Sequence, residues 1–229
     1  MPIFNTQINW RTKTEMIYST LREAIMSGDL KPGERIVLSK VASDLGVSTI
    51  PVREAIKQLA SEGLIDLSAH SEATVSRLSE KDFRELTDIR VLLESYAARL
   101  ATERATPEFI AELKEELAEM QECVSQLDYK CYGIMNLNFH RTIYAFCGNE
   151  QLEKMIDSIT VRTYRARAIF SYNQSRLRES FAEHQAIVEA IVAGQADRAA
   201  EMVAAQTQIG LKLFLQYSLN VQDQQVMGD

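Results

Sequence analysis

The sequence contains no long apolar run and no secretory leader. No stretch reaches the roughly 18 consecutive apolar residues that a membrane helix needs. Residues 1–16, MPIFNTQINWRTKTEM, lack the basic and then apolar segments of a leader peptide. We therefore expect a cytoplasmic protein that has no membrane partner.

Cysteine is scarce, and its spacing matches no common disulfide or zinc motif. Cys123, Cys131 and Cys147 are an odd number of cysteines and contain no CxxC pair. This pattern argues against a disulfide framework and against a zinc ribbon. We expect three reduced thiols that serve as packing residues.

The common catalytic signatures are also missing. The sequence has no HExxH, no GxSxG and no glycine-rich phosphate loop. Because these patterns carry the chemistry of many hydrolases and nucleotide-binding enzymes, we do not expect an enzyme.

The chain does contain enough apolar residues to form a large core, and its charge is unevenly distributed. The chain has 229 residues, is 46% hydrophobic and carries a formal charge of −7. Residues 1–78 hold nine basic and nine acidic residues, so the whole negative charge falls on residues 79–229. This change in composition predicts a domain boundary near residue 78.

Residues 1–78 show the order of a winged helix-turn-helix. Residues 14–26 carry Ile17, Leu21 and Ile25 on one helical stripe, and a short helix is predicted over 39–45. Gly46 ends that helix, and Ser48 begins another, in which Pro51 is tolerated because it lies in the first turn. The segment LIDLSAHSEATVSRL then reads as two strands around a polar turn.

The helix that begins at Ser48 has two distinct faces. Val52, Ala55, Ile56 and Leu59 form its inward stripe, which leaves Thr49, Arg53 and Lys57 on the outward face. An arginine near the start of such a helix can reach guanine O6 and N7 or a phosphate. Periodicity alone leaves open both DNA binding and an ordinary helical hairpin.

The stretch LREAIMSGDLKPGERI, followed by LSKVASDLGVSTIPVREAIKQLASEGLI, resembles the DNA-binding domain of the GntR superfamily of bacterial transcription regulators. The resemblance implies a homodimer that places two winged helices on a palindromic DNA operator. The residues expected to contact DNA are Ser39, Lys40, Ser48, Thr49, Arg53, Lys57 and His70.

Two features depart from that family. Thr49 stands where the family commonly has arginine. The wing tip is His70-Ser71-Glu72, whereas the family commonly has a basic wing tip that contains a glycine. Base readout should therefore rest more on Arg53, with Ser48 and Thr49 on phosphate or a thymine methyl group. The acidic wing should weaken binding to the minor groove.

Residues 79–220 read as a second domain made entirely of helices. Ser79 and Thr106, the latter followed by Pro107, are typical helix starts, whereas Gly148 and Gly194 mark breaks. About six helices of bundle length result. The first has an inward stripe of Phe83, Leu86, Leu93, Tyr96, Ala97 and Leu100. Residues 221–229 lack periodicity, so we expect a frayed tail.

The segments NLNFHRTIYAFCGNEQL and AEHQAIVEAIVAGQADRAAEM resemble the ligand-sensing FCD domain of the FadR-type branch of the same superfamily. That domain is an antiparallel bundle around a small-molecule pocket. In many members one aspartate and three histidines hold a divalent metal there. Here the first two histidines match His140 and His184, but Asn136 replaces the aspartate and Gln206 the third histidine.

These positions predict an effector pocket with a weakened metal site. Asn136 and His140 share one helix face, and Arg90 on the first bundle helix needs either Glu94 or an anionic effector as its partner. We expect the pocket to contain Arg90, Asn136, His140, His184 and Gln206. A divalent ion such as zinc or nickel would bind weakly at Asn136, His140 and His184.

The sequence thus predicts a mainly α protein with an N-terminal winged helix-turn-helix and a C-terminal antiparallel helical bundle. Its expected function is to regulate transcription, as repressor or activator, in response to a small effector such as an organic acid. Three alternatives stay open. The histidines are ordinary core residues, they form the site of a metal-dependent enzyme, or the chain is a helical interaction protein.

Overall fold

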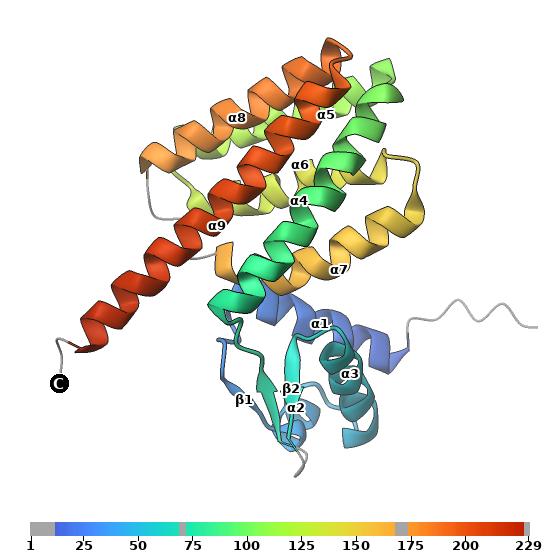
Figure 1. Cartoon of the computed structure of the whole chain (residues 1–229). Helices are drawn as coiled ribbons and strands as arrows, with labels where there is room; N and C mark the ends of the chain where they lie inside the picture. Colours follow the sequence, from blue (N-terminus) through green and yellow to red (C-terminus); the bar gives the residue numbers. More distant parts are fainter. Residues whose placement is uncertain (1–11, 69–71, 168–173, 227–229) are drawn as a thin grey trace, which may run out of the picture. The chain divides into compact units, whose positions relative to one another are not determined.

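The computed structural model describes residues 12–68, 72–167 and 174–226. Within these ranges the protein is mainly α, with nine helices and one three-stranded sheet (Figure 1). The chain forms two compact units, residues 1–77 and 78–229. None of the described helices is both long enough and apolar enough to cross a membrane.

Unit 1 contains three helices, α1 (Lys13–Ser27), α2 (Leu38–Asp44) and α3 (Thr49–Ser61). Thr12 caps α1 through a reciprocal capping box with Glu15. Gly46 links α2 to α3 with a φ of 65°, a left-handed conformation that glycine adopts without steric cost. The predicted inward stripes of α1 and α3 are confirmed, since every residue in them is buried.

Three short antiparallel strands complete unit 1. They are β1 (Arg35–Ile36), β2 (Ile65–Leu67) and β3 (Ala73–Val75), in the order β1-β3-β2. The two strands of the wing were expected, but β1 was not. A strand of two residues is too short to show alternation in the sequence. Helix, helix-turn-helix and wing together make a winged helix-turn-helix.

Unit 2 is a bundle of helices, as the sequence predicted. Its members are α4 (Glu80–Glu103), α5 (Pro107–Ser125), α6 (Tyr129–Ala145), α7 (Glu150–Arg167), α8 (Gln174–Val192) and α9 (Ala196–Val226). Figure 1 shows α4 running beside α9. The side chains of Ser79 and Thr106 cap α4 and α5. The core draws buried apolar side chains from α4, α5, α6, α7, α8 and α9.

Two details of the bundle differ from the sequence expectation. Tyr96, expected to face inward, is 51% exposed, because it follows Leu92 on the outer side of α4. Helix α9 continues to Val226, well into the segment 221–229 that was expected to fray. No proline or glycine lies between Leu211 and Val226, so nothing in the local sequence ends the helix.

The expectation of three reduced cysteines is wrong. Cys123 near the end of α5 and Cys131 in the first turn of α6 form a disulfide, with Cα atoms 5.7 Å apart. The short connection between the two helices brings these residues together, and an odd cysteine count could not reveal it. Cys147 is a free thiol and is buried.

Candidate functional site

Helix α3 presents a row of polar side chains on the surface of unit 1. Thr49, Arg53 and Lys57 are all exposed, on the side opposite the buried stripe. Lys57 forms an ion pair with Glu54 at 3.0 Å. Arg53 has no hydrogen-bond or ion-pair partner among the described residues. Its guanidinium is therefore available to a ligand that approaches this face.

Other residues expected to contact DNA surround this row. Ser48 occupies the N-cap of α3, but its side chain makes no capping hydrogen bond, so the hydroxyl is not used by the helix. Ser39 and Lys40 are exposed in the first turn of α2. His70 lies outside the described residues.

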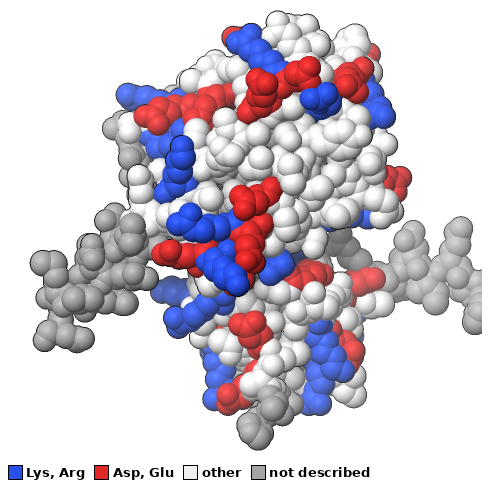
Figure 2. Space-filling view, viewed as in Figure 1, with Lys and Arg blue, Asp and Glu red and all other residues white. Residues whose placement is uncertain are grey.

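The charge of the wing is partly offset. Glu72 forms an ion pair with Arg35 at 2.8 Å, which joins the wing to β1. On the face shown in Figure 2, basic and acidic side chains are interspersed. Because residues 1–78 hold nine basic and nine acidic residues, we expect any attraction of DNA by unit 1 to come from local groups such as Arg53 rather than from its net charge.

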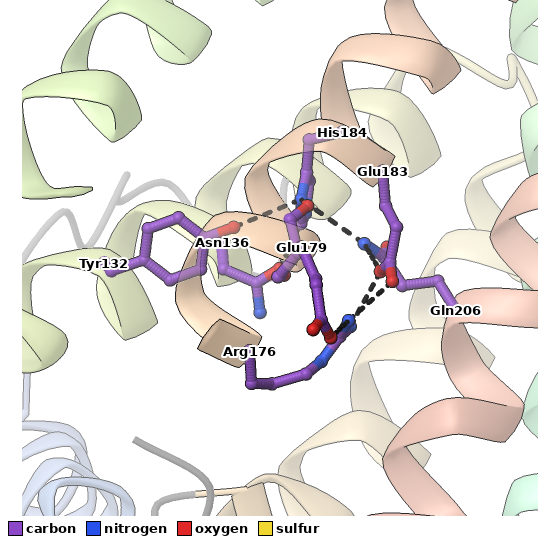
Figure 3. Close-up of polar contacts among 8 residues, drawn as sticks. Tyr132, Asn136, Arg176, Glu179, Glu183, His184 and Gln206 are labelled. Atoms are coloured by element: carbon purple, nitrogen blue, oxygen red, sulfur yellow. Dashed lines mark hydrogen bonds and ion pairs between the residues drawn. The ribbon is translucent and has the colours of Figure 1, made fainter. Parts of the chain in front are cut away.

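In unit 2, two of the residues matched to the metal-binding pattern, Asn136 and Gln206, contact a third, His184 (Figure 3). Asn136 extends from α6 and places its Oδ1 2.7 Å from His184 Nε2. Gln206 extends from α9 and places its Nε2 3.3 Å from His184 Nδ1. The carbonyl oxygen of Ser180 lies 2.6 Å from the same Nδ1. His184 is fully buried, so its polar atoms depend on these neighbours.

A second layer of polar groups holds this cluster. Arg176 binds both carboxylate oxygens of Glu183 at 2.5 and 2.7 Å, and Gln206 donates to the same carboxylate. Burial opposes the charge of Arg176, but its bonds with Glu183 outweigh that effect and raise its pKa. Burial also raises the pKa of Tyr132, whose hydroxyl lies 3.4 Å from His184 Nδ1.

The donor set in this cluster does not fit a divalent transition metal. If Nδ1 of His184 donates to the Ser180 carbonyl, Nε2 is the nitrogen left for a metal, and the Asn136 amide already contacts it. The four matched side chains are two imidazoles and two neutral amides. Among the described residues, no group of three or more His, Cys, Asp and Glu could hold a metal ion.

His140 connects this cluster to a cavity. Its ring lies 5.1 Å from that of His184, centroid to centroid, and its Nδ1 lies 3.3 Å from the Tyr144 hydroxyl. The cavity has a volume of about 410 Å³ and is lined from α4, α5, α6 and α7. Arg90 also lines it, whereas Asn136, His184 and Gln206 do not. The structure thus divides the expected pocket residues between a cavity wall and an adjacent polar cluster.

Arg90 is the buried cation of this cavity. It is only 3% exposed, and its Nε donates to Glu94 Oε1 at 2.7 Å. The other oxygen of Glu94 accepts from the Thr207 hydroxyl at 2.7 Å. Of the two partners considered from the sequence, Glu94 is present. The terminal nitrogens of Arg90 have no partner among the described residues, so they can still donate to an anion in the cavity.

Sequence reasoning missed another buried polar residue in the cavity wall. Thr160 on α7 is 7% exposed and lines the cavity, yet its hydroxyl has no hydrogen-bond partner among the described residues. A single threonine within a helix gives no sequence signal of this kind. Only the packing of α7 beside α4 and α6 brings it to the wall that carries Arg90 and His140.

Two family models match the chain. Residues 13–75 match the model described as bacterial regulatory proteins, gntR family, and residues 85–207 match the FCD domain. These ranges lie within unit 1 and unit 2, respectively. Together they contain the α3 row, the cavity and the polar cluster.

Similar proteins match most of the chain. The HTH-type transcriptional regulator McbR of Escherichia coli is 31% identical over 79% of this chain and 82% of its own length. The probable D-xylose utilization operon transcriptional repressor of Paenarthrobacter nicotinovorans is 29% identical over 76% of each chain. The solved structure of McbR/YncC from E. coli superposes with a TM-score of 0.82 and covers 90% of this chain and 99% of that one.

Proposed function

The chain belongs to the gntR family of bacterial regulatory proteins and carries an FCD domain. We propose that it binds a palindromic operator as a homodimer, and that a small effector lowers or raises its affinity for that DNA. It is a transcription regulator, as its relatives are. We further propose that it acts in the cytoplasm and has no enzymatic activity of its own.

The α3 row is the observation that carries the DNA-binding part of the proposal. Arg53 is exposed and has no partner among the described residues, and it lies near the start of a helix whose opposite face is buried in the unit core. In a winged helix-turn-helix this is the helix that enters the major groove. Arg53 is the group that reads a base, while Ser48, Thr49, Lys57, Ser39, Lys40 and His70 contact the DNA backbone or neighbouring bases.

Selection from genomic DNA tests this function directly. Fragments of the source genome are incubated with the full chain at physiological salt, and the bound fragments are recovered and sequenced. We expect a small set of fragments that share one inverted repeat. Recovery of fragments without a common sequence would contradict the proposal, because the binding would then be nonspecific.

An apolar row on α4 supports a homodimer. Ile89, Leu92 and Tyr96 follow one another along the outer side of the helix, and Leu92 is 71% exposed. Large apolar side chains that lie together on a surface commonly mark a protein interface. A second copy of the chain would cover the row and would supply the second winged unit that a palindromic operator requires.

The cavity is the effector site in this proposal. Its wall includes two buried groups whose donors lack partners among the described residues, the terminal nitrogens of Arg90 and the hydroxyl of Thr160, and donors of this kind suit a carboxylate. The Asn136, His184 and Gln206 cluster supports the wall behind His140 and does so without a metal. The factor by which an effector changes DNA affinity cannot exceed the ratio of its own affinities for the two arrangements of the dimer.

A further inference from the structure

The residues that line the cavity fall into two groups by burial, and we call the parts of the wall that they form its buried end and its open end. Arg90, Glu94, His140 and Thr160 are all buried, whereas Glu112 on α5 and Glu153 on α7 are exposed or half-buried. All six residues line the same cavity of about 410 Å³. A ligand that fills this space must therefore satisfy two different sets of groups.

The buried end has unused hydrogen-bond donors. Glu94 is engaged through both oxygens, by Arg90 and by Thr207, so it has little capacity to bind a ligand. The terminal nitrogens of Arg90 and the hydroxyl of Thr160 lack partners among the described residues. A buried hydroxyl without a partner is costly, and the forked N–H groups of arginine match a carboxylate.

The open end has unused acceptors. The guanidinium of Arg141 binds Asp157 at 2.5 Å, so both of those charges are offset. Neither Glu112 nor Glu153 has a cationic partner within the described parts of the chain. The lining holds four carboxylates and two guanidiniums, a formal charge of −2 when His140 is neutral. A ligand with only negative charge would be repelled by this wall.

We propose that the cavity selects a dipolar ligand, a small amino carboxylate. Its carboxylate binds Arg90 and Thr160 at the buried end, and its ammonium group faces Glu112 and Glu153 at the open end. This inference rests on the proposed function in one respect, namely that the cavity is the effector site. It narrows the effector from any organic acid to one that also carries a positive charge.

Calorimetric titration of the full chain with a matched five-carbon series tests the inference. The probes are 5-aminopentanoate, pentanoate, glutarate and pentylamine, which differ in the charges at their two ends. We expect 5-aminopentanoate to bind about tenfold more tightly than each of the others. Thr160→Val should weaken the binding of both 5-aminopentanoate and pentanoate, because both carry the carboxylate.

Variants of the open end separate the two halves of the site. The double variant Glu112→Gln, Glu153→Gln should abolish the preference for 5-aminopentanoate over pentanoate. It should weaken 5-aminopentanoate binding, and it should leave pentanoate binding equal to that of the parent or tighter, because two carboxylates no longer repel the anion. The control Glu189→Gln removes an exposed carboxylate of α8 that does not line the cavity, and it should change neither affinity. Melting temperatures near that of the parent show that each variant is folded.

Other results would overturn the inference. Glutarate or pentanoate binding as tightly as 5-aminopentanoate would exclude a dipolar site but leave a carboxylate effector in place. Unchanged 5-aminopentanoate binding in the double variant would exclude the open end as the ammonium site. If none of the four compounds binds at millimolar concentration, the cavity is not a carboxylate site. Operator binding is measured separately, so the proposed function as a DNA-binding regulator would still be tested.

Discussion

At the scale of single residues, two arginines differ in the partners that surround them. Arg53 is exposed and has no partner among the described residues, whereas Arg90 is buried and donates to Glu94. An exposed, unpaired arginine contributes little to folding stability, so its removal reports mainly on binding. Substitution of Arg90 would instead leave Glu94 without its cation and would disturb the fold.

Arg53→Ala should therefore lower operator affinity without lowering stability. We expect a loss of about 1–3 kcal/mol of binding free energy, the range for one arginine that reads a base. Fluorescence anisotropy with labelled operator measures this loss, and thermal unfolding measures stability. Arg178→Ala, which removes an exposed arginine of α8, is the matched control. Equal operator affinities for the parent and Arg53→Ala would remove Arg53 from the readout.

Restoring the metal ligands of the family should create a metal site. The variant Asn136→Asp, Gln206→His supplies a carboxylate and a third imidazole beside His140 and His184, which is a strong donor set for zinc or nickel. We expect tight, stoichiometric binding by calorimetry in the variant and weak or no binding in the parent. Stoichiometric zinc that stays with the parent through chelator treatment would show that the present side chains are sufficient.

The site residues differ in how far the sequence could predict them. The i, i+4 spacing places Arg90 beside Glu94, and the outward position of Arg53 follows from the apolar stripe behind it. Thr160, Glu112 and Glu153 join the cavity wall only through the packing of different helices. No local sequence pattern indicates that residues of different helices will line one cavity, so these residues could not be predicted from the sequence.

At the scale of secondary-structure elements, the contact between α5 and α6 contains a partly buried acid, Glu116. Glu116 on α5 accepts a hydrogen bond from the Thr142 hydroxyl at 2.7 Å, while its second oxygen is buried without a partner. Partial burial raises the pKa of Glu116, which the Thr142 bond opposes and the nearby Glu112 and Glu119 reinforce. The ionised form is thus disfavoured in the folded protein.

This shift gives a stability difference with a defined sign. Because the folded pKa lies above the unfolded one, Glu116 is free of this penalty below its unfolded pKa and destabilises the fold as pH rises through the folded pKa. Glu116→Gln should raise the melting temperature at pH 7.5, by roughly 2–4 °C for each kcal/mol gained. Near pH 4 the variant and the parent should melt together. A gain of the same size at both pH values would contradict this origin.

The boundaries of elements were predictable where a side chain or glycine sets them. Ser79, Thr106 and Gly46 each mark an end that the structure also shows. Strand β1 depends on pairing with β3, and the Cys123–Cys131 disulfide depends on the turn between α5 and α6. Both features arise from contacts between different segments, and the hydrophobic periodicity of a single segment gives no information about such contacts.

At the scale of the whole molecule, the proposed function requires two copies of the chain. Leu92→Glu places a charge in the exposed apolar row of α4, and a charge buried at an interface is costly. We expect sedimentation at micromolar concentration to show monomers for this variant and dimers for the parent. Val192→Glu, which changes an exposed apolar residue at the end of α8, should remain dimeric. A parent that sediments as a monomer would exclude the dimer.

The proposed dimer also has a consequence for how the chain would select DNA. Residues 1–78 carry no net charge, so a single winged unit has little electrostatic attraction for DNA. Specific affinity should instead come from two Arg53 side chains that read two half-sites on one duplex. The operator should therefore lose most of its affinity when either half-site is destroyed.

The most direct test of the account is an anisotropy titration of the full chain against two duplexes at physiological salt. One duplex carries the complete inverted repeat recovered from genomic DNA, and the other carries the same repeat with one half-site scrambled. We predict that scrambling weakens binding by at least about 100-fold. Equal affinity for the two duplexes would contradict it, because the chain would then bind DNA without reading an operator as a dimer.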